Sequence, residues 1–486
     1  MKLKKIKDFK HKEIIILSVL FLIVYLLTLS CSFDEEDSIH LTLGIRDFNI
    51  NDYRPHPPGY PVYIFLGKIF NFFTHDELLA QTILGAICGA LSLLVFYFLI
   101  FEMFNKKIAL MSALIMAVTP LFWIGSLKAL TDIPALFFTL LSMYFIYCFI
   151  KYKKINNLYI GSLISGISVG VRLQTLFVLF PLLVYACFVL KKKKEIFLTL
   201  LYFSIGILIW LIPVFIINGF KAYIRTMYNH TLFVLSFKGP QATGIGGGIT
   251  FDYLFSRTKL FSKFFLAGGY GFELDKFNIF NISYLLVLLF FLFLSIEKLK
   301  NKQILFFVIG ISVNIILVFI FLPSENIRYF LILIPFISLL LSLGVSWFEK
   351  YSWLAFILIF VLLFVFSFPL AQKIHTTPSP PIQLINYINE NYNSKENIFI
   401  FSPTIIRRFF MFHEIPSEDF AVIDRAYLDS LLSSDTTVFF VDPSNEVYGN
   451  YSQYYNITHI KTFERDLRIH IKHNTVFFFE VKTKEI

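Results

Sequence analysis

Charged residues and cysteines are both scarce in this chain of 486 residues. Only 16% of the residues are charged, and the four cysteines stand far apart at positions 31, 88, 148 and 187. They form neither a CxxC pair nor a Cys/His group at metal-ligand spacing, which argues against a zinc or dithiol redox site. The shortage of charge argues equally against a soluble globular protein, whose surface would need charged residues along most of its elements.

Apolar residues are abundant instead, at 57% of the chain, and they come in runs near twenty residues long. A helix of about 17 to 25 apolar residues is long enough to cross a lipid bilayer. The sequence therefore predicts a polytopic α-helical membrane protein with about eleven transmembrane helices, near residues 14–31, 78–101, 108–126, 131–150, 157–171, 173–190, 196–217, 278–296, 304–322, 329–347 and 353–371.

Lysine-rich connections alternate between these spans, as at 151–154 and 191–194, and the positive-inside rule assigns that side to the cytoplasm. The N-terminus is then cytoplasmic, while the C-terminus and two long loops, 32–77 and 218–277, lie outside, as in a multi-pass protein of a prokaryotic plasma membrane. The lysine blocks also account for the net charge of +10, so nucleic-acid binding is not indicated. Glycines 244 and 246–248 predict a mobile segment in the second loop that closes over a donor or admits an acceptor.

The composition changes near Thr376, where Pro378, Pro380 and Pro381 indicate a linker. We expect a membrane domain over 1–375 and a small extracytoplasmic α/β domain over 376–486. Its predicted strands are 397–401, 437–441 and 476–481, and its predicted helices are 384–392 and 426–432.

Four acidic residues, Asp34, Glu35, Glu36 and Asp37, directly follow the first span. Like charges so close together repel one another, and they stay ionised more easily beside a cation, a metal ion or a basic substrate. The run is either a solvated start of the loop or part of an active site.

The same loop contains a rigid turn, Tyr53-Arg54-Pro55-His56-Pro57-Pro58-Gly59-Tyr60-Pro61, followed by the apolar run 62–73. Prolines fix φ and restrain the residues before them, so Arg54 and His56 can be held in place for an anionic group. The apolar run predicts a helix lying in the membrane interface.

An acidic run after the first span, a HPPG-type turn and an interfacial helix resemble, in this order, the GT-C glycosyltransferases. The HPPGYP segment is most similar to the protein O-mannosyltransferase relatives in that superfamily. Weaker similarity extends to Ala129-Leu130-Thr131-Asp132-Ile133-Pro134, to Gly170-Val171-Arg172-Leu173-Gln174 and to Arg328-Tyr329-Phe330.

The resemblance implies a membrane enzyme that takes a sugar from a polyprenyl-phosphate or dolichyl-phosphate donor and transfers it, with inversion, to a protein, lipid or glycan acceptor outside the cytoplasm. It implies a catalytic base at Asp37, with Asp34 as second choice. The further site residues are, for the donor phosphate, His56, Arg54, Arg172 and Arg328, and, for substrate contacts, Glu36, Tyr60, Gln174 and Tyr329.

Alternatives stay open for Asp132 and for the two arginines, Arg172 and Arg328, each of which either binds the donor phosphate or snorkels to the interface at a helix end. Asp132 either helps Asp37 to hold a divalent metal ion, Mg or Mn, as in some GT-C enzymes, or caps its helix ahead of Pro134. Arg172 falls at a turn between two short spans, where a cation below the membrane surface costs about 2.5–3.5 kcal/mol unless it faces water or an anion. We therefore expect Arg172 to line an aqueous cavity.

The main rival from another class is a multi-span transporter or flippase for a lipid-linked or cell-envelope substrate. The sequence shows no internal repeat, no matching pair of broken helices and no ionisable residue near the centre of a span, which are the features typical of such carriers. An oligosaccharyltransferase is disfavoured because no WWDYG-like segment occurs.

Overall fold

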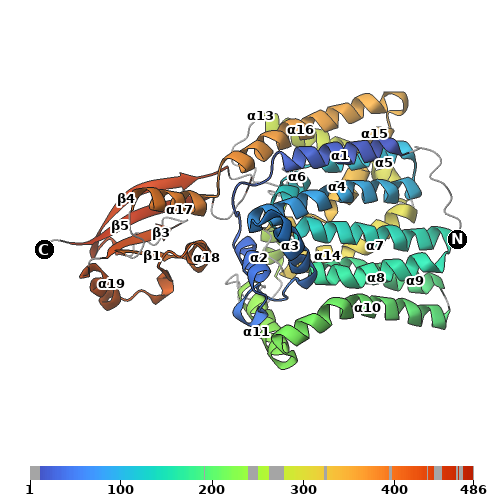
Figure 1. Cartoon of the computed structure of the whole chain (residues 1–486). Coiled ribbons are helices and arrows are strands. Elements are labelled where there is room, and N and C mark those ends of the chain that lie inside the picture. The colour runs from blue at the N-terminus through green and yellow to red at the C-terminus, as the bar shows by residue number, and fades with distance from the viewer. Residues whose placement is uncertain are drawn as a thin grey trace.

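The computed structural model describes residues 11–190, 192–238, 250–261, 279–300, 302–321, 326–392, 397–434, 436–442, 451–466, 469 and 474–484. Most of the chain forms a bundle of roughly parallel and antiparallel helices, and a small sheet domain stands beyond one end of it (Figure 1). The bundle helices are α1 (Lys12–Leu26), α4 (Glu77–Met103), α5 (Lys106–Val118), α6 (Pro120–Leu127), α7 (Asp132–Tyr152), α8 (Ile155–Val171), α9 (Leu176–Leu190), α10 (Lys193–Asn218), α13 (Ile279–Leu294), α14 (Lys302–Phe321), α15 (Leu333–Ser346) and α16 (Ser352–Thr376).

Each of the eleven ranges predicted to cross the membrane overlaps a bundle helix, and the third range overlaps two, α5 and α6. Within the described residues, six helices are long and apolar enough to cross a bilayer, or seven if α5 and α6 count as one span bent by 60°. The bend falls at Pro120, which cannot continue the hydrogen-bond ladder of α5. Other bundle helices, such as α8 and α15, are apolar but shorter. The number of eleven transmembrane helices therefore stays a prediction.

Small residues let neighbouring helices approach closely. A Cβ atom on Gly166 of α8 would lie 2.2 Å from the carbonyl oxygen of Phe203 in α10, and one on Gly206 would lie 2.3 Å from that of Leu163. The Ser142 and Ser165 hydroxyls join α7 to α8 at 2.6 Å. Close backbone packing and interhelical hydrogen bonds are what hold helices together in lipid, where burial of apolar surface provides no net drive.

The first long loop is structured throughout. It contains α2 (Glu36–Arg46), a 3₁₀ turn at Ile50–Asp52 called η1, and α3 (Pro61–Thr74), which is the helix predicted from the apolar run. Gly59 has φ of +99°, and a Cβ there would meet the Ile50 side chain at 2.4 Å. Only glycine combines that backbone with that space, so Gly59 fixes how the proline-rich turn delivers His56 and Tyr60.

The C-terminal domain is a five-stranded mixed sheet with strand order β2-β1-β3-β5-β4. The predicted strands correspond to β1, β3 and β5, and the predicted helices to α17 and α19; β2, β4 and α18 were not predicted. The elements are α17 (Pro380–Asn391), β1 (Ile398–Ser402), α18 (Thr404–Phe412), β2 (Ser417–Asp419), α19 (Arg425–Leu432), β3 (Thr437–Asp442), β4 (Tyr455–Glu464) and β5 (Thr475–Thr483).

The second long loop begins with α11 (Phe220–Lys238) and contains α12 (Phe251–Phe261). The glycines predicted to form a mobile segment, at 244 and 246–248, lie outside the described residues.

Candidate active site

Arg328 stands at the centre of a group of carboxylates that the sequence separates widely. It comes from a 3₁₀ turn, η6 (Ile327–Phe330), ahead of α15, and its side chain is 13% exposed. One guanidinium nitrogen lies 3.2 Å from Glu35 Oε2 and 3.7 Å from Asp132 Oδ2, and the other forms a short ion pair with Asp37. Arg328 therefore joins the acidic run of the first loop to the start of α7.

Arg172 completes the charged cluster from the turn between α8 and η2 (Leu173–Thr175). Its guanidinium lies 2.8 Å from Asp132 Oδ1, donates to Thr131 Oγ1 at 2.8 Å and donates to Gln174 Oε1 at 2.7 Å. The structure thus places an anion beside the cation that the sequence puts at a recessed turn. The Tyr329 ring has both guanidinium groups within 5.5 Å of its centroid, at a distance that suits cation–π contact.

Asp37 also faces the proline-rich turn. His56 Nε2 lies 3.7 Å from Asp37 Oδ1 and 2.9 Å from the Tyr60 hydroxyl. Burial alone would raise the pKa of Asp37, but the Arg328 guanidinium outweighs it and holds that pKa well below its usual range. Burial lowers the pKa of His56 to about 3, against the opposing pull of Asp37. At neutral pH the pair is therefore a carboxylate beside a neutral imidazole, so His56 supplies hydrogen bonds here and no positive charge.

Two predicted site residues lie elsewhere. The Asp34 carboxylate forms a buried ion pair with Arg465, which precedes β5 in the C-terminal domain, and both side chains are at most 2% exposed. Arg54 pairs at 3.3 Å with Asp47 on the surface, where both side chains are about half exposed or more. Among the described residues, the ion pairs of Arg328 include neither Asp34 nor Arg54. Glu36 begins α2 and is partly exposed.

Sequence reasoning missed several participants. Glu35 was seen only as part of an acidic run, because nothing in the run shows which members face Arg328. Lys128 is buried, donates to the Ile469 carbonyl oxygen at 2.9 Å and lies 3.9 Å from Glu35. A lysine in a turn on the side that the positive-inside rule leaves poor in lysine was the available signal.

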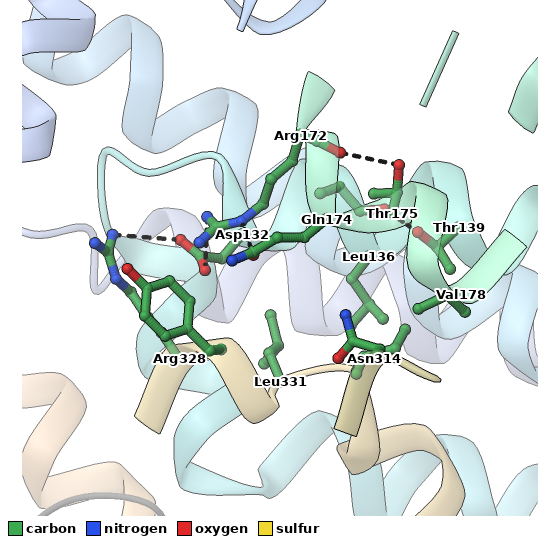
Figure 2. Close-up of a pocket in the computed structure, with 13 residues that line it drawn as sticks. Asp132, Leu136, Thr139, Arg172, Gln174, Thr175, Val178, Asn314, Arg328 and Leu331 are labelled. Atoms are coloured by element: carbon green, nitrogen blue, oxygen red, sulfur yellow. Dashed lines mark hydrogen bonds and ion pairs between the residues drawn. The ribbon is translucent and has the colours of Figure 1, made fainter. Parts of the chain in front are cut away.

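A pocket extends from this cluster into the bundle (Figure 2). Asp132, Arg172 and Arg328 line its charged end. Its other walls are formed by Gln174, Thr175 and Tyr329 near the cluster and, deeper in the helices, by Thr139, Asn314, Ala135, Leu136, Val178, Leu331 and Ile332.

The divalent-metal site predicted at Asp37 and Asp132 does not match this arrangement of side chains. In the part of the chain that the structure describes, no group of three or more His, Cys, Asp or Glu side chains could hold a metal ion. Asp37 and Asp132 are joined by Arg328, so a divalent ion would have to displace a guanidinium group that already neutralises them. The residues as arranged do not fit a divalent-metal centre.

The fold of this chain matches the folds of solved membrane glycosyltransferases. The oligosaccharyltransferase of Archaeoglobus fulgidus, solved with Zn and sulfate, matches with a TM-score of 0.55 and 12% identity over 92% of this chain and 71% of that one. ArnT from Cupriavidus metallidurans, bound to undecaprenyl phosphate, matches with a TM-score of 0.55 and 10% identity over 97% and 98%. This chain therefore shares the fold of these membrane glycosyltransferases.

Part of the sequence also matches the model of one protein family. The model for dolichyl-phosphate-mannose-protein mannosyltransferases matches residues 55–217, from the proline-rich turn to the end of α10. No protein of curated function matches the sequence. The family and fold matches leave the transporter alternative without support.

The lowered pKa of His56 leads to a test of stability. In the folded protein His56 resists protonation, whereas in the unfolded chain it takes up a proton near pH 6.5. The free energy of unfolding that His56 contributes is therefore fully present above pH 6.5 and is lost as the pH falls towards about 3. We expect acidification from pH 7 to pH 5 to lower the unfolding temperature in detergent, with His56 contributing on the order of 1–2 kcal/mol.

The change His56→Gln should reduce that pH dependence, as followed by thermal unfolding at both pH values. The exposed His459 on β4 offers a matched control, since His459→Gln should leave the slope unchanged. An equal slope in wild type and His56→Gln would show that this imidazole is not held neutral.

Proposed function

We propose that this protein transfers one sugar from a polyprenyl-phosphate or dolichyl-phosphate carrier to a hydroxyl group of a protein, lipid or glycan acceptor, with inversion at the anomeric carbon. The observation that carries the proposal is the arrangement around Arg328. A carboxylate, Asp37, pairs with the guanidinium of Arg328, and Arg328 lines a pocket together with Arg172, the second guanidinium of the cluster.

The proposed reaction needs a carboxylate as base and cationic groups for the phosphate, and few other groups. The acceptor oxygen forms a bond to the anomeric carbon while the bond from that carbon to the phosphate oxygen breaks, and the acceptor proton passes to Asp37. The lipid phosphate leaves with the bonding electrons, and Arg172 and Arg328 stabilise its charge. A phosphate monoester is a good leaving group, so electrostatic stabilisation replaces protonation by an acid.

The pairing of Arg328 with Asp37 suggests how the base becomes active. While Arg328 pairs with Asp37, it holds the carboxylate at a low pKa, and a carboxylate with a low pKa is a weak base. A donor phosphate competes for the same guanidinium. When the phosphate takes Arg328, the pKa of Asp37 rises, so the base gains strength when the donor is in place.

The location of the reaction follows from charge. The lysine-rich connections favour a cytoplasmic assignment for the opposite end of the bundle, and this places the Arg328 cluster and the C-terminal domain outside. Lipid-linked sugars are then reached from the bilayer and acceptors from the extracytoplasmic solution. The neighbour ArnT is bound to undecaprenyl phosphate in one of its structures, which supports a carrier of that chemistry.

The direct experiment supplies purified protein in nanodiscs with radiolabelled sugars carried on polyprenyl monophosphate, on polyprenyl diphosphate or on nucleotides, together with a membrane extract as the acceptor source. We expect transfer from the monophosphate carrier alone, release of free polyprenyl phosphate and inversion at the anomeric carbon of the product. Transfer from a nucleotide sugar, or movement of intact donor across the bilayer without cleavage, would refute the proposal.

A further inference from the structure

The deep end of the pocket carries an amide that the proposed reaction does not use. Asn314 lies within α14, in an 18-residue stretch of mean hydropathy 2.6, yet its side chain lines the pocket together with Arg172 and Arg328. A polar side chain inside a span faces a protein partner or a cavity, because contact with lipid leaves its hydrogen bonds unmade. Figure 2 shows the Asn314 amide reaching the pocket from the side opposite Gln174.

Within the described residues, no hydrogen bond to the protein explains the position of the Asn314 side chain. The residue is 5% exposed, and among the described residues none donates to or accepts from its side chain. Its amide is not among the polar atoms that are fully buried without a partner, and it lines the pocket, so it is open to hydrogen bonds with whatever enters there.

Two neighbouring polar side chains, those of Gln174 and Thr139, can also form hydrogen bonds with a ligand. Gln174 accepts from Arg172 through Oε1, which leaves its amide hydrogens available. Thr139 donates to the Ala135 carbonyl oxygen at 2.7 Å, which leaves its hydroxyl oxygen as an acceptor. Apolar side chains, those of Leu136, Val178 and Leu331, fill the walls between them. Uncharged donors and acceptors among apolar walls match the hydroxyls and C–H faces of a sugar ring.

We infer that Asn314, with Thr139 and Gln174, binds the hydroxyl groups of the donor monosaccharide and selects which sugar is transferred. The inference rests on the proposed function, because the phosphate at Arg172 and Arg328 directs the sugar into this end. A site built to hydrogen-bond a hydroxyl rejects the analogue that lacks it, since the polar groups of the site are left unpaired.

The test uses a panel of polyprenyl-phosphate-linked hexoses and pentoses, then the monodeoxy series of the sugar that wild type accepts best. Wild type should lose about tenfold or more in kcat/KM when the hydroxyl read by Asn314 is removed. Asn314→Leu, of similar volume, should transfer the parent sugar about tenfold less well and treat the parent and that deoxy donor alike.

Thr139→Val keeps the shape of its side chain and should change the discrimination at a different hydroxyl. Ser312→Ala is the matched control, because Ser312 lies on the same helix outside the pocket lining and donates only to the Ile309 carbonyl oxygen. A uniform loss over all donors in Asn314→Leu, or unchanged discrimination in both variants, would overturn the inference while leaving the transferase function intact. Absence of transfer by wild type from every donor would reject the proposed function, and this inference with it.

Discussion

Replacing Asp37 with asparagine is expected to reduce sugar transfer by about three orders of magnitude. A positioned general base contributes roughly 10²–10⁴-fold, and the amide keeps the size of the side chain while losing its basicity. The protein should still fold, because Arg328 retains Glu35 and Asp132 as partners. Transfer of labelled sugar per mole of purified protein, with the unfolding temperature measured on the same samples, gives the result.

The control for this change lies in the same loop. Asp47 is exposed and pairs only loosely with Arg54, so Asp47→Asn removes a carboxylate near the site without touching the Arg328 cluster. Transfer should stay near wild type. If Asp37→Asn retained a tenth or more of the activity, Asp37 would not be the base, and the role of the cluster would reduce to binding the donor phosphate.

Replacing Arg465 with methionine is expected to destabilise the protein by about 3–5 kcal/mol, because it leaves the buried Asp34 carboxylate unpaired. Arg465 also donates to the Thr377 carbonyl oxygen at 3.2 Å, so the linker to the C-terminal domain loses a contact. Since Asp34 stands three residues before Asp37, transfer should fall with stability. Thermal unfolding in detergent and transfer at a temperature where the variant is folded measure the two effects.

A double substitution separates charge from packing. Arg465→Met combined with Asp34→Asn removes both charges, so it should recover part of the loss seen in Arg465→Met alone. Arg425→Met is the matched control, because Arg425 is exposed and lies 4.0 Å from Asp429 on the surface. A double variant as unstable as the sum of the two single ones would mean that Asp34 and Arg465 are not coupled. In that case Asp34 would return as a candidate for the catalytic role that its position in the acidic run first indicated.

Local patterns predicted most of the elements. Long apolar runs gave the bundle helices, and the short apolar runs after Thr376 gave β1, β3 and β5. The strand β4 was missed because its residues alternate between partly buried and exposed, with polar side chains such as Asn456, Thr458 and Lys461. The bend at Pro120 was missed because apolar residues continue across it, although a proline inside a span is a usual cause of a kink.

The sequence pointed to residues that lie together in the structure, but it did not show how they pair. Charge and motif led to Asp37, His56, Arg172 and Arg328, which the structure brings into one cluster. Which carboxylate meets which guanidinium depends on contacts between residues hundreds of positions apart, and no local pattern contains that information. Asp34 and Glu35 differ by one position, yet one faces Arg465 and the other Arg328. Asn314 escaped notice because the search of the spans considered ionisable residues only.

The ion pair between Asp34 and Arg465 also sets an order of events during biosynthesis. The two residues are 431 positions apart, and at a synthesis rate of about 5–20 residues per second the first waits roughly 20–90 s for the second. For that time the loop that carries Asp37 lacks the partner that anchors it. The proposed sugar transfer is therefore expected to begin only after the domain that contains Arg465 has been made.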